Sequence, residues 1–83
     1  MDINEYKIIE IDFGDYIEKE TSYRFQISYS SRDKTFDIDR LYYQSEEDRW
    51  SCFTSEFNNL TRAQLMMIRA NIDKILTMTD TEV

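Results

Sequence analysis

Carboxylates are the side chains of this sequence whose type and spacing could do chemistry. Glu10 and Asp12 are two residues apart, and the pair Asp37 and Asp39 repeats that spacing. Residues two apart on a strand share one face at a separation of about 6.6–7 Å, so each pair is expected to project from one side of a sheet. A third acidic group, Glu46-Glu47-Asp48, falls in a polar segment. Rows of carboxylates can imitate nucleic-acid phosphates and pair with Arg and Lys of another protein.

Three other uses of these carboxylates compete with that interpretation. A calcium loop needs further oxygen ligands and a glycine at the bend, which neither Asp37-x-Asp39 nor residues 46–48 provide. A general acid and base need a deep cleft and a fixed separation, and an acidic chain offers some carboxylate pair by chance. The acids can also keep a small domain soluble, and charge alone does not separate that use from a binding face.

The rest of the functional-group inventory argues against catalysis. The chain has no histidine, one glycine, no proline and one cysteine, with 17 acids against 10 bases and a net charge of −7. It therefore lacks the usual proton-transfer group near neutral pH, a glycine-rich phosphate loop and a cluster of soft metal ligands. We predict a non-enzymatic protein with no catalytic residue, cofactor or metal, whose function is contact with another macromolecule.

Cys52 stands alone, so no intramolecular disulfide can form. A lone thiol fits a reducing compartment, and we expect a cytoplasmic protein in which Cys52 is a small buried residue. Residues 1–5 are acidic and lack the features of a signal peptide. No run approaches the roughly 18 apolar residues of a membrane span, and the negative charge disfavours anionic lipid, so we expect no membrane contact.

Alternating apolar and polar residues predict four strands. The clearest covers residues 23–29, and the others are expected at 7–13, 35–43 and 49–54, with polar turns at 30–34 and 44–48. Gly14-Asp15 is expected to end the first strand, because glycine tolerates positive φ. In the third strand Arg40 falls on the apolar side, which predicts a bulge or bend near residues 39–41. Tyr42 and Tyr43 must point to opposite faces, so one of them is expected near the surface as a binding anchor.

The C-terminal segment carries the strongest helix signal. Thr61 and Gln64 match a capping box. Apolar residues then recur at helical spacing, which predicts an amphipathic helix whose apolar stripe packs on a sheet: Leu65, Ile68, Ile72, Ile75 and Leu76.

Together these elements predict one α+β domain over residues 1–83. We expect a three- or four-stranded antiparallel meander with the C-terminal amphipathic helix packed on one face. The ordered core should cover about residues 6–77, with residues 78–83 frayed. Because the helix covers one face only, the other would stay open, with Ile8, Leu41, Tyr43 and Phe53 among its polar groups. An open apolar strip of this kind often marks a partner or homodimer interface.

The order of elements resembles that of PC4, a family of transcriptional coactivators that bind single-stranded DNA. The resemblance covers about Tyr6 to Leu76 and rests on element order, with Leu-Thr-Arg-Ala-Gln-Leu at residues 60–65 as the helix start. It implies a nucleic-acid-binding module with a basic sheet surface. The bases that could form such a surface stand among aspartates in this chain: Arg24, Arg32, Lys34 and Arg40.

Charge and size lead to a first functional hypothesis, an inhibitor or adaptor that binds a basic nucleic-acid enzyme or nuclease. Size and charge are similar to those of the small acidic proteins that phages and mobile elements use against host nucleases. The residues predicted to bind the partner are carboxylates and one aromatic anchor: Glu10, Asp12, Asp37, Asp39, Glu46, Glu47 and Asp48, with Tyr42 or Tyr43. One alternative is a single-stranded nucleic-acid-binding module, which the net charge disfavours unless the bases gather on one face. The other is a subunit that forms a homodimer through the open sheet face.

Overall fold

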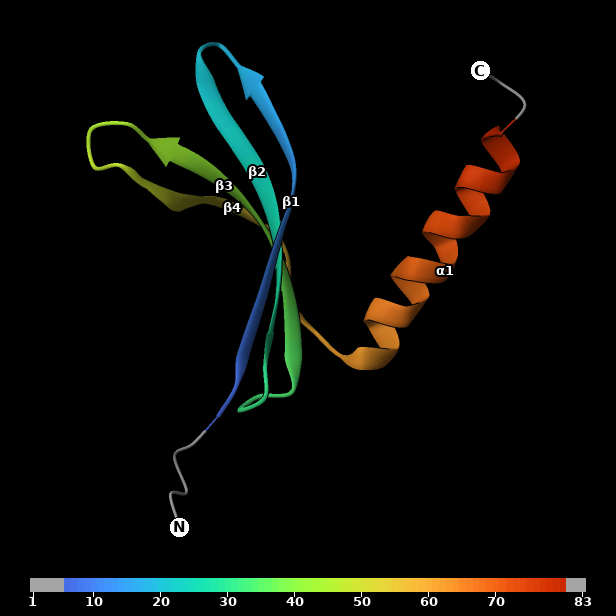
Figure 1. Ribbon diagram of the computed structural model, residues 1–83. Helices are drawn as coiled ribbons and strands as arrows, with labels where there is room; N and C mark the ends of the chain where they lie inside the picture. Colours follow the sequence, from blue (N-terminus) through green and yellow to red (C-terminus); the bar gives the residue numbers. More distant parts are fainter. Residues whose placement is uncertain (1–5, 81–83) are drawn as a thin grey trace.

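The computed structural model describes residues 6–80, which form four strands followed by one helix (Figure 1). The elements are β1 (Ile8–Glu18), β2 (Thr21–Ser30), β3 (Thr35–Gln44), β4 (Arg49–Leu60) and α1 (Arg62–Thr79). Each strand pairs antiparallel with the next, in the order β1-β2-β3-β4. The predicted α+β class, an antiparallel meander followed by a C-terminal helix, is confirmed.

The first strand is longer than predicted, because Gly14-Asp15 forms a bulge inside it. Phe13 pairs with Phe25 and Tyr16 pairs with Tyr23, so two residues of β1 oppose one residue of β2. The bulge keeps Tyr16 on the same side of the sheet as Phe13. Gly14 has a φ of +67°, and a Cβ there would lie 3.3 Å from Cδ2 of Phe25. Both the backbone and the close approach therefore favour glycine at this position.

Short turns with left-handed residues close the three hairpins. Lys19 and Glu20 have φ of 49° and 68° and join β1 to β2, as in a two-residue type I′ turn whose twist matches that of the strands. The other two hairpins close within the segments predicted as turns. Each ends in a residue of positive φ, Lys34 before β3 and Asp48 before β4.

β4 continues to Leu60, past its predicted end at residue 54, and holds the irregularity expected near residues 39–41. Arg40 pairs with Thr54 and Leu41 pairs with Cys52, so Phe53 is an extra residue of β4. The pairing of β3 with β2 runs without a shift, so the alternation within β3 is intact. Arg40 therefore remains on the apolar side of the sheet, and the bulge belongs to the neighbouring strand.

The helix begins as predicted. Thr61 is its N-cap: the Thr61 hydroxyl accepts a hydrogen bond from the Gln64 amide at 3.2 Å, and Gln64 Oε1 accepts one from the Thr61 amide at 2.9 Å. This is the complete capping box. α1 extends to Thr79, beyond the expected end of the ordered core, and residues 81–83 of the predicted frayed tail lie outside the described residues.

The position of the helix differs from the expected arrangement on one face of the sheet. α1 and the sheet diverge from Thr61 like the arms of a V (Figure 1). Leu65 and Ile68 are half-buried near the vertex, whereas Ile72 and Leu76 are 51% and 62% exposed. The physical reason is the connection: one residue between β4 and α1 leaves no loop that could carry the helix back over its own sheet.

Candidate functional site

The two faces of the sheet differ in chemistry, and one of them is mainly apolar. This apolar face consists of Phe53 and four cross-strand rungs: Ile9-Tyr29-Phe36-Leu60, Ile11-Ile27-Ile38-Phe57, Phe13-Phe25-Arg40-Thr54 and Tyr16-Tyr23-Tyr42-Ser51. Its rings stack across the strands, with centroids 5.6 Å apart for Phe13 and Phe25 and 5.2 Å apart for Tyr16 and Tyr23. Ile11 is nevertheless 58% exposed, so the face lies largely open.

Phe53 belongs to this apolar face, which corrects its expected position beside Leu41 on the other side. Its ring contacts Tyr23 and Tyr42 edge-on, with centroids 5.5 Å and 6.0 Å away. Cys52 pairs with Leu41 on the other side of the sheet, so the alternation along β4 places the next residue, Phe53, on the apolar face. The open strip predicted from Ile8, Leu41, Tyr43 and Phe53 is therefore divided between the two faces.

Arg40 is the charged residue in the middle of the apolar face. Its Nε lies 3.0 Å from Glu56 Oε1, and its Nη1 donates to the Tyr16 hydroxyl at 3.1 Å. The guanidinium also lies 5.1 Å from the ring centre of Phe25, a cation–π contact. Both partners of the ion pair keep about a third of their side-chain surface exposed.

The opposite side, here called the acidic face, carries the two predicted acid pairs. Its rungs are Glu10-Ser28-Asp37, Asp12-Gln26-Asp39-Ser55, Arg24-Leu41-Cys52 and Tyr43-Trp50. Glu10 and Asp37 flank β2 in one rung, and Asp12 and Asp39 flank it in the next. Neighbouring strands lie about 4.8 Å apart, so the acids of one rung are roughly 10 Å apart and those of successive rungs about 7 Å apart. The four predicted carboxylates thus share one side of the sheet.

Arg24 lies on this face and neutralises part of its negative charge. It donates to Asp15 Oδ2 at 2.9 Å and approaches Asp12 Oδ2 at 3.4 Å, while its guanidinium lies 3.8 Å from the centre of the Trp50 ring. The ring of Trp50 contacts that of Tyr43, with centroids 5.5 Å apart. This stack was not predicted, because it joins β2 to β4 across the intervening strand and no local pattern signals it.

The third acidic group lies apart from the other two. Glu46, Glu47 and Asp48 occupy the β3–β4 turn, beyond the rung of Tyr43 and Trp50. Glu47 Oε2 lies 2.6 Å from Arg49 Nε, and the Tyr43 hydroxyl donates to Asp48. That hydrogen bond, with a smaller effect of desolvation and the Asp48 charge, raises the pKa of Tyr43 above its ordinary value. The nine predicted partner-binding residues therefore divide into a face, a turn and two tyrosines.

The consecutive tyrosines point to opposite sides, as the alternation predicts. Tyr42 pairs with Tyr23 on the apolar face, whereas Tyr43 pairs with Trp50 on the acidic face. Both side chains are half-buried. An aromatic anchor beside the predicted acids can therefore be Tyr43, and Tyr42 belongs to the other face.

The four bases that could bind nucleic acid do not gather. Arg24 lies on the acidic face in contact with carboxylates, and Arg40 lies on the apolar face beside Glu56. Arg32 and Lys34 belong to the β2–β3 turn, where Arg32 lies 5.8 Å from the ring centre of Tyr6. No basic sheet surface of the kind implied by the resemblance to the coactivator family is formed by these residues.

Cys52 lies exposed on the acidic face, which corrects the expectation of a buried cysteine. Partial desolvation, and secondly the charge of Asp39, raises the pKa of the thiol. The thiolate needed for nucleophilic chemistry is therefore disfavoured at this position. Among residues 6–80 no three carboxylate or cysteine side chains come close enough together to hold a metal ion.

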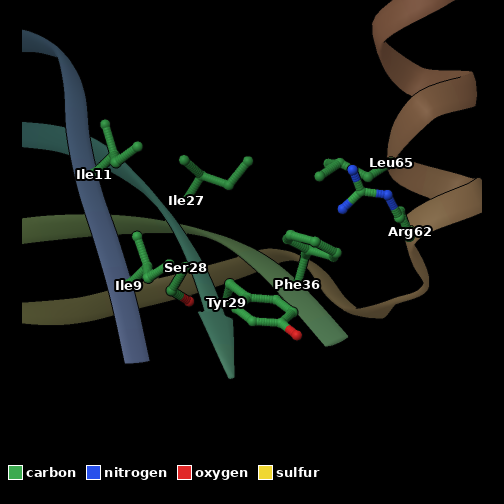
Figure 2. Close-up of a pocket in the computed structure, with 8 residues that line it drawn as sticks. All are labelled: Ile9, Ile11, Ile27, Ser28, Tyr29, Phe36, Arg62 and Leu65. Carbon is green, nitrogen blue, oxygen red and sulfur yellow. The ribbon is translucent and has the colours of Figure 1, made fainter. Parts of the chain in front are cut away.

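An open hollow of about 370 Å³ lies where the two arms of the V meet (Figure 2). Ile9, Ile11 and Ile27 line it from the sheet, and Phe36 and Leu65 meet at its helix side. The strand alternation and the helical stripe predict the elements that carry these residues. The helix was expected to cover this side of the sheet, so an exposed surface here was not predicted.

The fold and these surfaces define a small acidic protein whose sheet has one apolar and one charged face. Comparison with known proteins finds no matching family model, no matching curated protein and no matching solved structure. In the described part of the chain, no helix has the length and apolar character required to cross a membrane.

Proposed function

We propose that this protein is a non-enzymatic binding protein whose acidic face pairs with a basic protein, of the kind that handles nucleic acids. The observation that carries the proposal is the register that brings Glu10, Asp12, Asp37 and Asp39 to one side of the sheet. Among the strand residues of this face within residues 6–80, Arg24 is the single base. A surface of this kind attracts cationic partners and repels nucleic acid.

The layout of the carboxylates supports an acidic face that imitates the phosphates of a nucleic acid. Spacings of about 7 Å along the strands are close to the separation of successive phosphates on one nucleic-acid strand, and carboxylate oxygens accept the same hydrogen bonds from Arg and Lys. Glu10 has no ion-pair or hydrogen-bond partner within the described residues, and neither has Asp39. These acids can pair with a partner without breaking contacts inside the chain.

Tyr43 and Trp50 extend the same face toward the β3–β4 turn. Aromatic side chains of this kind contribute large contact areas at small entropic cost, and they are frequent hot spots of protein interfaces. Their position beside Glu46, Glu47 and Asp48 makes the turn a second contact for the partner. The proposal includes a cytoplasmic location, where an exposed Cys52 thiol stays reduced.

The test compares two variants of equal charge. The first carries Glu10→Gln, Asp37→Asn and Asp39→Asn, whose amides keep an acceptor oxygen for the contact between Asp37 and the Asn59 amide. The second, with Glu18→Gln, Glu20→Gln and Asp73→Asn, removes the same charge from the β1–β2 hairpin end and the helix.

Each protein is tagged and used for affinity capture from lysate of its native host, with washes at about 50 and 500 mM salt, a range over which charge screening rises steeply. We expect the wild type and the second variant to hold a basic nucleic-acid-handling protein at low salt and release it at high salt, and the first variant to lose it. Equal capture by both variants would refute the acidic face. Nucleic acid co-purifying without a basic protein would favour the nucleic-acid-binding alternative.

A further inference from the structure

We infer that a second copy of this chain covers the apolar face, and that each copy lays the apolar stripe of its α1 on the sheet of the other. The stripe consists of Leu65, Ile68, Ile72, Ile75 and Leu76. Within residues 6–80, Leu41 is the one hydrophobic side chain that is buried, and it lies on the acidic side of the sheet. Apart from the contact near the vertex, where Leu65 and Ile68 are half-buried, the apolar face and the helix stripe are therefore left open by their own chain.

The surplus surface of the single chain matches what a homodimer buries. The accessible surface is 7188 Å², whereas a compact monomer of 10.1 kDa exposes about 5300 Å². The radius of gyration is 16.0 Å, against about 12 Å for a compact domain of this length. The surplus of about 1900 Å² lies within the roughly 1000–2500 Å² that each subunit of an obligate homodimer buries.

The connection between β4 and α1 favours exchange of the helix over closure within one chain. Thr61 alone separates the elements, and its φ of −77° and ψ of 165° are held by the capping box. Connections between strands and helices that pack on each other usually need about two to six residues. A helix that leaves its sheet through a shorter connection is directed toward another copy, the arrangement known as domain swapping.

Length and charge also fit a second copy. The stripe from Leu65 to Leu76 spans about 17 Å along the helix, and the four rungs of the apolar face span about 20 Å along the strands. Residues 62–79 contain three bases and one acid, a net charge of +2. Because the whole chain has a net charge of −7, the residues outside the helix carry −9. The helix charge therefore adds only a long-range attraction between two acidic chains, while the contact itself is apolar. Its apolar side chains also fill the hollow beside Phe36 (Figure 2).

The first test is the mass of the wild-type protein in solution, measured by sedimentation equilibrium at micromolar concentrations. We expect twice the chain mass of 10.1 kDa, unchanged at high salt because the contact is mainly apolar. Ile72→Glu should raise the dimer dissociation constant at least about 100-fold, since it places a charge in the apolar contact. Met67→Glu, on the other side of the helix and 64% exposed, is the matched control and should leave the mass unchanged. A folded wild-type monomer would overturn the inference, as would equal effects of the two variants.

A crosslinking test remains decisive if Ile72→Glu fails to fold. In a Cys52→Ser background, one chain carries Leu76→Cys and a second carries Ile11→Cys, and the two are mixed and treated with a short bismaleimide. Any product between the two different chains is intermolecular, and we expect it in high yield. Replacing Ile11→Cys with Glu10→Cys moves the thiol to the acidic face and should abolish it. Equal yields from these two positions would refute helix exchange.

The inference does not depend on the acidic-face proposal. The mass and crosslinking experiments contain only this protein, so a failure of dimerisation leaves partner capture untouched. Conversely, neutralising Glu10, Asp37 and Asp39 should remove partner capture while the dimer persists, because these residues lie on the side of the sheet away from the contact.

Discussion

The contribution of the Arg40–Glu56 ion pair to the free energy of unfolding depends on whether the apolar face is exposed to water or covered by a partner. Arg40 Nε and Glu56 Oε1 are 3.0 Å apart, and both side chains are about a third exposed in the single chain. An exposed pair of this kind contributes about 0.2–1 kcal/mol to the free energy of unfolding. Under a partner helix, the same pair is desolvated, and removing one charge then costs about 3–5 kcal/mol because the other stays buried and unpaired. The stability lost on Glu56→Gln should therefore differ by several kcal/mol between an exposed and a covered apolar face.

The assay is urea unfolding followed by circular dichroism, with all variants at one protein concentration because the stability of a dimer depends on it. Glu47→Gln is the matched control, since the Glu47–Arg49 pair is similarly close but lies in the β3–β4 turn with both side chains more than half exposed. We expect Glu56→Gln to lose about 3–5 kcal/mol and Glu47→Gln at most about 1 kcal/mol. Equal small losses would show that the apolar face remains in water and would refute the reasoning behind the dimer.

Two further predictions concern the acidic side of the sheet. Leu41→Ala should lower the free energy of unfolding by about 2–4 kcal/mol, because Leu41 is 9% exposed and pairs with Arg24 in the sheet. Ile17→Ala, at a residue that is 74% exposed, should change it by no more than about 0.5 kcal/mol in the same urea titration. The pKa of Cys52 is raised, so alkylation of its thiol by iodoacetamide should reach half its maximal rate at a higher pH than in a short unstructured peptide. Asp39→Asn should remove the smaller, electrostatic part of that shift. A wild-type pH profile identical to that of the peptide would contradict the prediction.

The features of the fold that depend on interactions between residues close in sequence were predicted correctly from local sequence patterns. The capping box of Thr61 and Gln64 involves residues three apart, so the helix start could be located from the sequence. The alternation over residues 23–29 likewise predicted which side of β2 is apolar. The same rule placed Tyr42 and Tyr43 on opposite faces, because successive residues of a strand alternate whatever its neighbours are.

Features that depend on pairing between strands could not be predicted in the same way. The bulge at Gly14-Asp15 lengthens β1, and the face that Phe53 joins is set by the pairing of Cys52 with Leu41. A glycine at a strand end and a glycine in a bulge look alike in sequence, and only the partner strand distinguishes them. The stack of Arg24 on Trp50 depends on a register that no single segment determines.

The helix illustrates a different limit. Its apolar stripe shows that Ile72 and Leu76 need a cover, but amphipathicity does not state which chain supplies it. The single-residue connection at Thr61 was visible in the sequence only once the end of β4 was known to be Leu60 and not residue 54. Because β4 extends to Leu60, only Thr61 connects it to α1, and the helix therefore does not fold back over its own sheet as predicted.

The two faces also constrain each other. If the apolar faces of two copies meet through exchanged helices, their acidic faces point outward on opposite sides of the dimer, with the two Arg40–Glu56 pairs enclosed between them. Two faces directed away from each other cannot pair with one flat basic surface, so each must take its own partner molecule. Among residues 6–80 Leu41 is the one buried hydrophobic side chain, and the dimer supplies the buried apolar area that this part of the chain lacks. It also leaves Glu10, Asp37 and Asp39 uncovered in both copies. Stability and recognition are thereby assigned to opposite sides of one sheet.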